Sequence, residues 1–230
     1  MRGLYAIADV GTLDARGLDA VAFARAVLRA KPAALQLRAK DVPPREALAL
    51  LRAIAPLCHL AGVPLVANDR PDLAILAGCD LVHVGQDDMP IDRVRRIAPG
   101  IGVGVSTHTL EQLEAAFAAR PSYVAIGPIF ETSTKRNADP VVGLAVLRAA
   151  SVRARAAGVP LVAIGGITRE RAVELAGLVD AAAVVSALLP PPVAPDTYPA
   201  AADRLREVTA RATQMQAALL PKAAAAGAAR

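Results

Sequence analysis

Short apolar runs alternate with longer amphipathic stretches along most of this chain. Eight runs are apolar over four or five residues, as expected for parallel strands that are buried on both faces. They are Leu4–Ala8, Ala33–Leu37, Pro64–Ala67, Leu81–Val84, Ile101–Val105, Tyr123–Ile126, Pro160–Ile164 and Ala181–Val185. The pattern therefore predicts eight strands, each covered on both sides.

The stretches between these runs carry apolar residues at spacings of three and four, which predicts helices with one buried face. They are Leu18–Ala30, Arg45–Ala61, Arg70–Ala77, Asp92–Ile97, Leu110–Ala119, Leu144–Ala157, Arg169–Leu178 and a final helix, Tyr198–Ala217. Boundary signals agree, because Gly62 and Gly158 each end a helix just before a strand.

Eight strand–helix units that fill 230 residues favour the α/β class and a single closed (β/α)8 TIM barrel. An open, doubly wound sheet is the alternative. We expect one catalytic barrel domain over residues 1–219, followed at 220–230 by a low-complexity, alanine-rich tail.

Composition narrows the possible functions. The net charge is +5, but no run of five or six cations occurs, aromatics are 3% and tryptophan is absent. These features argue against nucleic-acid binding. The two cysteines, Cys58 and Cys79, form neither a disulfide framework nor a metal-ligand motif, so we expect both to be small core residues.

The N-terminus contains acids and lacks a long apolar stretch, which argues against a signal peptide. No segment approaches 18 continuous apolar residues, so we expect no membrane span. The sequence thus predicts a cytoplasmic protein.

Polar residues follow the predicted strands, where barrel enzymes carry their chemistry. After the second run, alternation places Gln36, Arg38 and Lys40 on one face, pointing into the barrel and its mouth. Two cations and an amide suit an anion. The alternative is the solvated face of an edge strand, which a closed barrel does not have.

Carboxylates follow the third and fourth runs, as Asp69 and as Asp87-Asp88. Acids at neighbouring strand ends suit Mg²⁺, which typically takes one or two carboxylates together with phosphate oxygens. The alternatives are that Asp69 caps the helix that starts near Pro71, and that the other two are ordinary loop acids.

The fifth run leads into Ser106-Thr107-His108-Thr109, where a serine or threonine is expected to cap the next helix, and Ser106 alternatively reaches a ligand oxygen. His108, two residues on, is more readily explained as a solvated residue at a helix start. The loop after the sixth run extends to about Gly143 and offers two hydroxyls and a cation in Thr132, Thr134 and Lys135, which suit a phosphate.

The seventh and eighth runs end in Gly165-Gly166 and Val185-Ser186. Loops at these two positions form the usual phosphate site of a TIM barrel, and paired glycines let the backbone approach a ligand closely. The sequence therefore predicts a second anion site, built from backbone N–H groups.

Taken in order, the motifs at the strand ends resemble those of the thiamine phosphate synthase family, from about Leu4 to Leu189. They are Gln36-Leu-Arg38-Ala-Lys40, Asn68-Asp69-Arg70, Val82-His83-Val84-Gly85-Gln86-Asp87-Asp88, Ser106-Thr107-His108-Thr109, Gly127-Pro-Ile-Phe-Glu-Thr132-Ser-Thr134-Lys135 and Ile164-Gly165-Gly166-Ile167.

The resemblance implies a transferase that joins 4-amino-2-methyl-5-hydroxymethylpyrimidine diphosphate to a thiazole phosphate, giving thiamine phosphate and pyrophosphate. It implies Mg²⁺ as cofactor, held by Asp69 and Asp88, and makes a homodimer plausible. Arg38, Ser106 and Lys135 are the expected catalytic residues. The pyrimidine diphosphate would be held by Gln36, Arg38, Lys40, Asn68, Ser106 and Lys135, the last three at its diphosphate. The thiazole phosphate would be held by Thr132, Thr134, Gly165, Gly166, Val185 and Ser186.

Two alternatives stay open. A thiazole tautomerase, a related barrel, would keep the phosphate site and use a histidine such as His108 for acid–base chemistry. A non-catalytic barrel that only binds phosphorylated ligands would keep both anion sites without turnover.

Overall fold

Eight parallel strands close into a barrel in the computed structural model, which describes residues 1–132, 140–192 and 200–220. The strands are β1 (Gly3–Asp9), β2 (Ala34–Arg38), β3 (Leu65–Asn68), β4 (Leu81–Val84), β5 (Gly102–Thr107), β6 (Tyr123–Ile126), β7 (Leu161–Ile164) and β8 (Ala181–Val184). Because β1 pairs with both β2 and β8, the sheet has no edge. The predicted TIM barrel is confirmed, and the open sheet is wrong.

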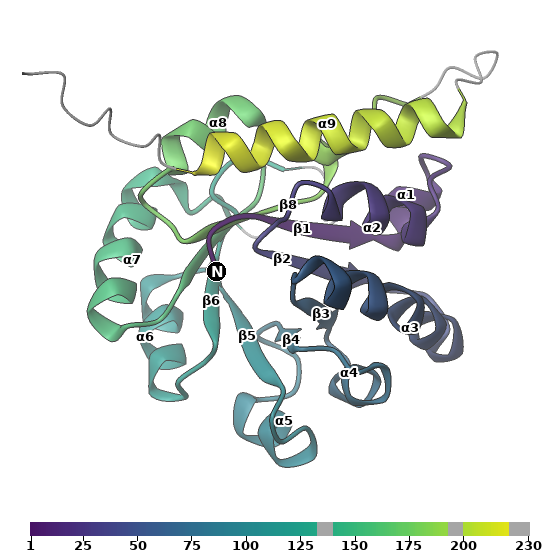
Figure 1. The fold of residues 1–230 in the computed structure, drawn as a ribbon. Coiled ribbons are helices and arrows are strands. Elements are labelled where there is room, and N and C mark those ends of the chain that lie inside the picture. Colours follow the sequence, from purple (N-terminus) through teal and green to yellow (C-terminus); the bar gives the residue numbers. More distant parts are fainter. Residues whose placement is uncertain (133–139, 193–199, 221–230) are drawn as a thin grey trace, which may run out of the picture.

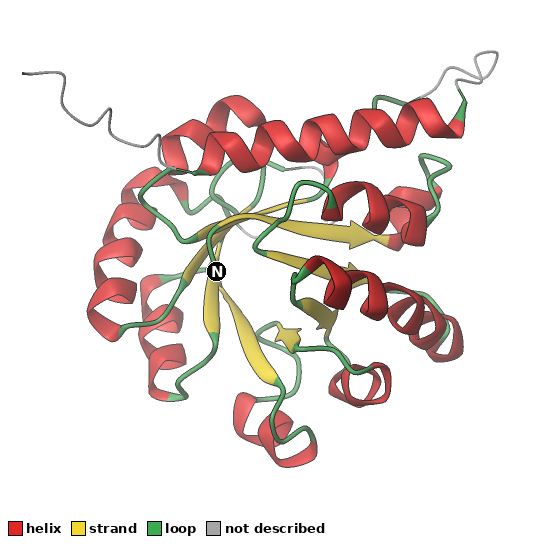
Figure 2. Ribbon diagram, viewed as in Figure 1, coloured by secondary structure: helices red, strands yellow, loops and turns green. Residues whose placement is uncertain are grey.

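Helices surround the barrel on its outside (Figures 1 and 2). In the described parts of the chain they are α1 (Val10–Asp14), α2 (Ala20–Leu28), α3 (Pro44–Ala61), α4 (Pro71–Ala77), α5 (Ile91–Ile97), α6 (Leu110–Ala118), α7 (Gly143–Ala157), α8 (Arg169–Leu175), the 3₁₀ turn η1 (Ser186–Leu188) and α9 (Ala201–Leu219). The last helix packs across α2, α8 and β1, and so covers the closure of the barrel (Figure 1). None of the described helices is long and apolar enough to cross a membrane.

The sequence pattern missed two short elements, α1 and η1. The first depends on Asp9, whose carboxylate accepts a hydrogen bond from the backbone N–H of Thr12 and so caps the helix. A helix of five residues is too short for its apolar spacing to stand out. The alanine-rich tail lies, from residue 221 on, outside the described residues, so the predicted boundary at 219 stays a prediction.

Two apolar layers follow from the alternation of side chains along the strands. Leu35 and Leu37 point outward and join the large core between barrel and helices, whereas Gln36 is buried in the interior. Both cysteines are buried in the outer core, as expected. Burial raises the pKa of each thiol to about 12, so both stay protonated at neutral pH.

Two tyrosines fill the barrel interior below its mouth. The rings of Tyr5 and Tyr123 meet edge to face, with centroids 5.7 Å apart and planes at 70°. The neighbouring strand makes room with Gly104, where an added Cβ would lie 2.0 Å from a ring carbon of Tyr123. Large residues on one strand thus require a glycine on the next.

We expect Gly104→Ala to lower the free energy of unfolding by about 2 kcal/mol or more, because overfilling a packed interior forces side chains from their preferred positions. Urea unfolding measures the change. Gly11→Ala is the matched control, because nothing lies within 4 Å of a Cβ at Gly11. Equal stability of the two variants would contradict this account of the interior.

Candidate active site

A cavity of about 260 Å³ opens at the carboxyl ends of the strands. All predicted site residues that the structure describes line it: Gln36, Arg38, Lys40, Asn68, Asp69, Asp88, Ser106, Thr132, Gly165, Gly166, Val185 and Ser186. The other two, Thr134 and Lys135, lie outside the described residues. The closed barrel therefore brings together residues that lie as far apart in the sequence as Gln36 and Ser186.

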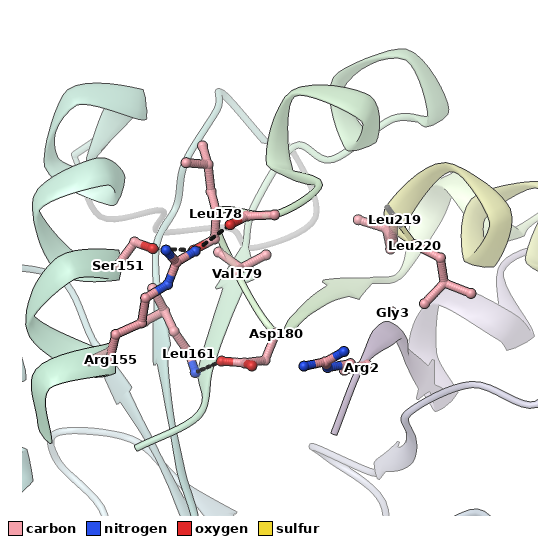
Figure 3. A pocket seen from close by; sticks show the side chains of 12 residues that line it. Arg2, Gly3, Ser151, Arg155, Leu161, Leu178, Val179, Asp180, Leu219 and Leu220 are labelled. Atoms are coloured by element: carbon pink, nitrogen blue, oxygen red, sulfur yellow. Dashed lines mark hydrogen bonds between the residues drawn. The ribbon is translucent and has the colours of Figure 1, made fainter. Parts of the chain in front are cut away.

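A second cavity, of about 370 Å³, lies at the opposite end of the barrel, where β1 and β7 begin (Figure 3). Three of its polar side chains form hydrogen bonds with the surrounding backbone. Arg155 donates to the carbonyl of Gly177, Ser151 donates to that of Leu178, and Asp180 accepts from the N–H of Leu161 at 2.9 Å. In TIM barrels this end of the fold usually contributes to stability, and the active site lies at the carboxyl ends of the strands. We therefore place the candidate site in the first cavity.

The cationic wall of that cavity is built around Arg38. Its Nη1 donates to Oδ2 of Asp9 at 2.5 Å, and Asp9 also accepts from the N–H and the hydroxyl of Thr12. Burial alone would raise the pKa of Asp9, but the hydrogen bonds from Thr12 and Arg38 lower it below its usual value. The guanidinium is therefore fixed in place, and Lys40 adds a second, exposed cation at the mouth.

Asp9 lines the cavity but was not among the predicted site residues. The signal was present, because Tyr5, Ile7 and Asp9 occupy alternate positions and an acid at the end of an apolar run stands out. Its function depends on Arg38, which is its direct neighbour across β1 and β2.

The carboxyl groups of Asp69 and Asp88 face each other on the next wall. Burial, together with a hydrogen bond and charge repulsion from Asp88, raises the pKa of Asp69 to about 6, against the opposite effect of Lys40 and Arg38. Asp88 also accepts from the backbone N–H of Gly85 at 2.7 Å. The positive charges of Lys40 and Arg38 therefore do not fully offset the burial of Asp69 and its repulsion by Asp88.

The alternative role of Asp69 as a helix cap is wrong, whereas Asp87 fits the alternative of an ordinary loop acid. Arg70, not Asp69, is the N-cap of α4, and it makes no side-chain capping bond. Asp69 has a positive φ of 61°, which turns the chain at the end of β3. Asp87 is exposed and does not line the cavity, whereas Asp88 does.

His83 and Ser106 form the deep wall of the cavity, below the charged groups. His83 Nε2 lies 2.8 Å from Ser106 Oγ, and Nδ1 lies 2.8 Å from the hydroxyl of Tyr123. Burial lowers the pKa of His83 to about 4, although the charge of Asp88 acts in the other direction. The imidazole is therefore neutral at physiological pH. We did not predict this role of His83 from the sequence, although alternation along β4 points its side chain inward.

The helix after β5 is capped by a hydroxyl residue of the Ser106–Thr109 segment, as expected. Thr109, not Ser106, caps α6 by accepting from the N–H of Gln112. His108 is not a solvated residue at the helix start, because it lines the cavity and its Nδ1 donates to the carbonyl of Gly127 at 2.7 Å.

The glycine-lined end of the cavity depends on contact between two loops. The N–H of Ile129 donates to the carbonyl of Ile164, and that of Phe130 to the carbonyl of Gly165. Gly166 has a φ of 63°, and a Cβ there would lie 2.3 Å from the carbonyl oxygen of Glu131. Packing between the loops therefore requires this glycine, a reason that the sequence alone did not give.

We expect Asp69→Asn to make the metal-free protein more stable at pH 8. The pKa of Asp69 is higher in the folded protein, at about 6, than its ordinary value of 3.8. The folded protein therefore loses stability as the pH rises from about 3.8 to above about 6 and Asp69 ionises, and an amide at this position avoids this loss. A gain of about 1 kcal/mol corresponds to a rise of about 2–4 °C in Tm, and it should vanish near pH 4. Asparagine also tolerates the positive φ.

Thermal unfolding in EDTA at both pH values measures this difference. Asp87→Asn is the matched control, since it removes an exposed acid outside the cavity. An unchanged or lower Tm for Asp69→Asn at pH 8 would contradict the destabilisation that we attribute to the burial of this charge beside Asp88.

Comparisons with known proteins agree on one family. The family model described as thiamine monophosphate synthase matches residues 4–188. The thiamine-phosphate synthase of Roseiflexus castenholzii is 44% identical over 195 residues, covering 83% of each protein. That of Koribacter versatilis is 46% identical over 198 residues, covering 82% of this chain and 90% of the relative.

A solved structure is also similar. Thiamine phosphate pyrophosphorylase from Pyrococcus furiosus superimposes with a TM-score of 0.74 at 28% identity, covering 93% of this chain and 96% of that one. The family model spans most of the barrel, and two relatives above 40% identity cover over four fifths of the chain. This chain belongs to the thiamine monophosphate synthase family.

Proposed function

We propose that this chain is a thiamine phosphate synthase, which couples 4-amino-2-methyl-5-hydroxymethylpyrimidine diphosphate with 4-methyl-5-(2-phosphoethyl)thiazole or its carboxylate. The products are thiamine phosphate and pyrophosphate. The observation that carries the proposal is the single cavity in which a cationic wall, a carboxylate pair and a glycine-lined end lie together. Membership of the family supports the same reaction.

The cationic wall suits a departing diphosphate. Arg38 is fixed by Asp9 through one nitrogen, which leaves the rest of its planar guanidinium for an anion. Lys40 at the mouth adds an exposed point charge, and Asn68 lies at the same end of the barrel. Fixed positive groups stabilise the negative charge that develops as the carbon–oxygen bond to the diphosphate breaks.

The carboxylate pair fits a magnesium ion. In the parts of the chain that the structure describes, no cluster of three or more acidic, imidazole or thiol ligands occurs, so Asp69 and Asp88 are the protein ligands that we propose. Two carboxylates suit Mg²⁺, which completes its shell with water and phosphate oxygens. When bound, the ion would neutralise charge on the diphosphate and offset the burial and the repulsion by Asp88 that together raise the pKa of Asp69.

The glycine-lined end suits the thiazole phosphate. Gly165 and Gly166 form one side and Val185 and Ser186 the other, at the loops where TIM barrels commonly bind phosphate. Thr132 lies in the cavity as well. With both substrates held in one cavity, the thiazole nitrogen is aligned with the methylene carbon of the pyrimidine, which is the main contribution of the scaffold.

No protein nucleophile is part of the proposed reaction. The electron-rich aminopyrimidine stabilises a methylene cation when the diphosphate leaves, and the thiazole nitrogen then forms the new carbon–nitrogen bond. Ser106 and His83 lie within hydrogen-bond distance, but a histidine with a pKa of about 4 is a poor base near pH 7. The pair therefore does not activate Ser106 for attack.

Other expectations stay predictions. The catalytic role of Lys135 and the contact of Thr134 concern positions outside the described residues. The homodimer and the cytoplasmic location rest on the sequence and its resemblance alone.

We expect product formation to require Mg²⁺ and Asp69. With both phosphorylated substrates, EDTA should abolish thiamine phosphate and pyrophosphate, and Asp69→Asn should lower kcat/KM by about a hundredfold or more. Independently of turnover, Mg²⁺ should raise the Tm of the wild type by a few degrees and leave that of the variant unchanged. Asp87→Asn should behave like the wild type in both measurements.

Other results would point to the alternatives. Isomerisation of thiazole carboxylate phosphate without coupling would identify a tautomerase, and His108 would be the next residue to change. Binding of both substrates without any product would identify a non-catalytic barrel. Full activity of Asp69→Asn would contradict the proposed metal site.

We expect Arg38→Lys to raise KM for the pyrimidine diphosphate about tenfold or more, with little change in KM for the thiazole phosphate. Lysine keeps the charge but loses the planar fork that contacts Asp9 and an anion at the same time. Steady-state kinetics with each substrate varied in turn measures both constants. Arg70→Lys, at an exposed arginine outside the cavity, is the control. An equal rise in both KM values would contradict the assignment of Arg38 to one substrate.

A further inference from the structure

A continuous chain of hydrogen bonds crosses the barrel beneath the cavity. It begins at Ser106, whose Oγ lies 2.8 Å from Nε2 of His83, and continues from Nδ1 of His83 to the hydroxyl of Tyr123, also at 2.8 Å. The hydroxyls of Tyr123 and Tyr5 are 2.7 Å apart. These links join β5, β4, β6 and β1 through the centre of the barrel.

This chain of hydrogen bonds ends on the cationic side of the cavity. The hydroxyl of Tyr5 donates to Oε1 of Gln36 at 2.9 Å, and Nε2 of Gln36 donates to Oδ1 of Asn68 at 2.7 Å. Both ends of the chain, Ser106 and Asn68, line the cavity. The tyrosines between them are fully buried or nearly so, at 2% and 0% exposure, so water does not interrupt the series.

Each hydroxyl and the neutral imidazole have one proton to donate, which allows only one donor-to-acceptor direction along the chain of hydrogen bonds. A hydroxyl has a single proton, and that of Tyr5 goes to Gln36, so Tyr5 accepts from Tyr123. The proton of Tyr123 is then used, and Nδ1 of His83 must donate to it. A neutral imidazole carries one N–H, so Nε2 accepts, and Ser106 donates to it.

This direction determines what each end offers a ligand. The proton of Ser106 points to His83, away from the cavity, and its oxygen keeps lone pairs for a hydrogen-bond donor. Asn68 has its carbonyl oxygen occupied by Gln36 and keeps its N–H groups for an acceptor. One end of the chain therefore suits a substrate N–H, and the other suits an anionic oxygen.

We propose that His83, Tyr123 and Tyr5 are positioning residues that hold Ser106 as a hydrogen-bond acceptor for the exocyclic amine of the pyrimidine substrate. This inference rests on the proposed function, because the aminopyrimidine provides the N–H. It assigns Ser106 to the amine, whereas the family resemblance implied a contact with the diphosphate, for which Ser106 would have to donate. The diphosphate is left to Asn68, beside Arg38 and Lys40.

The direction of the chain is tested first, without any substrate. Nitrogen NMR of protein labelled at its three histidines distinguishes protonated from unprotonated ring nitrogens, and His59→Gln and His108→Gln assign the signals. We expect His83 to carry its proton on Nδ1 at pH 7.5. In Tyr123→Phe, which removes the acceptor, the proton should move to Nε2. A proton on Nε2 in the wild type would overturn the proposal, since the whole chain would then run in reverse.

Thr107→Val is the matched control for these spectra. Thr107 lies next to Ser106 on β5, is buried, and donates its own hydroxyl to the carbonyl of Ala125 at 2.9 Å, on the other face of the strand. Loss of the Thr107 hydroxyl removes one buried hydrogen bond and leaves the hydrogen bonds from Ser106 to Asn68 in place. The His83 signals should stay as in the wild type, and a change like that of Tyr123→Phe would mean that general loosening of the barrel causes the shift.

The role of Ser106 is tested by binding. Calorimetry compares the monophosphate of 4-amino-2-methyl-5-hydroxymethylpyrimidine with its analogue lacking the amine. We expect the wild type and Thr107→Val to prefer the amine about five- to tenfold, and Ser106→Ala and Tyr123→Phe to prefer it twofold or less.

Each failure has a separate meaning. If Ser106→Ala preferred the compound with the amine as strongly as the wild type does, the assignment of the amine to Ser106 would be overturned. Absence of binding of either compound to the wild type would count against the proposed function itself, while the NMR result would still decide the direction of the chain. If Tyr123→Phe does not fold, the wild-type spectra and Ser106→Ala still provide both tests.

Discussion

The pairing of β1 with β8 is the contact on which the site depends. Once the sheet closes, every second side chain of each strand enters one narrow interior, and no strand has an edge where a polar face could meet water. The polar residues of β2, β4 and β5 then have only the mouth of the barrel and the polar side chains of other strands as partners. A cavity with charged walls and a hydrogen-bonded floor follows from this closure.

The sequence predicted the barrel well because its signal is local and repeated. Apolar runs of four or five residues located every strand, and glycines such as Gly62 and Gly158 marked helix ends that the structure has in the left-handed conformation. It also located the wall of Gln36, Arg38 and Lys40, since alternation along one strand determines which residues share a face. Such inferences need only neighbouring residues.

What the sequence did not predict depends on partners far apart in the chain. Asp9 matters because Arg38 lies beside it on the next strand, and His83 because Tyr123 and Ser106 come from two other strands. The need for glycine at position 166 comes from the loop that carries Glu131. No pattern within one strand contains these pairings, so only the assembled barrel reveals them.

The backbone at Asp69 limits how this site could change during evolution. A positive φ disfavours most side chains, while glycine, asparagine and aspartate adopt it readily. Of these three, only aspartate carries a charge, so a longer acid could not simply replace it without strain. A chain that loses this carboxylate and keeps this backbone therefore has glycine and asparagine, both neutral, as its unstrained replacements.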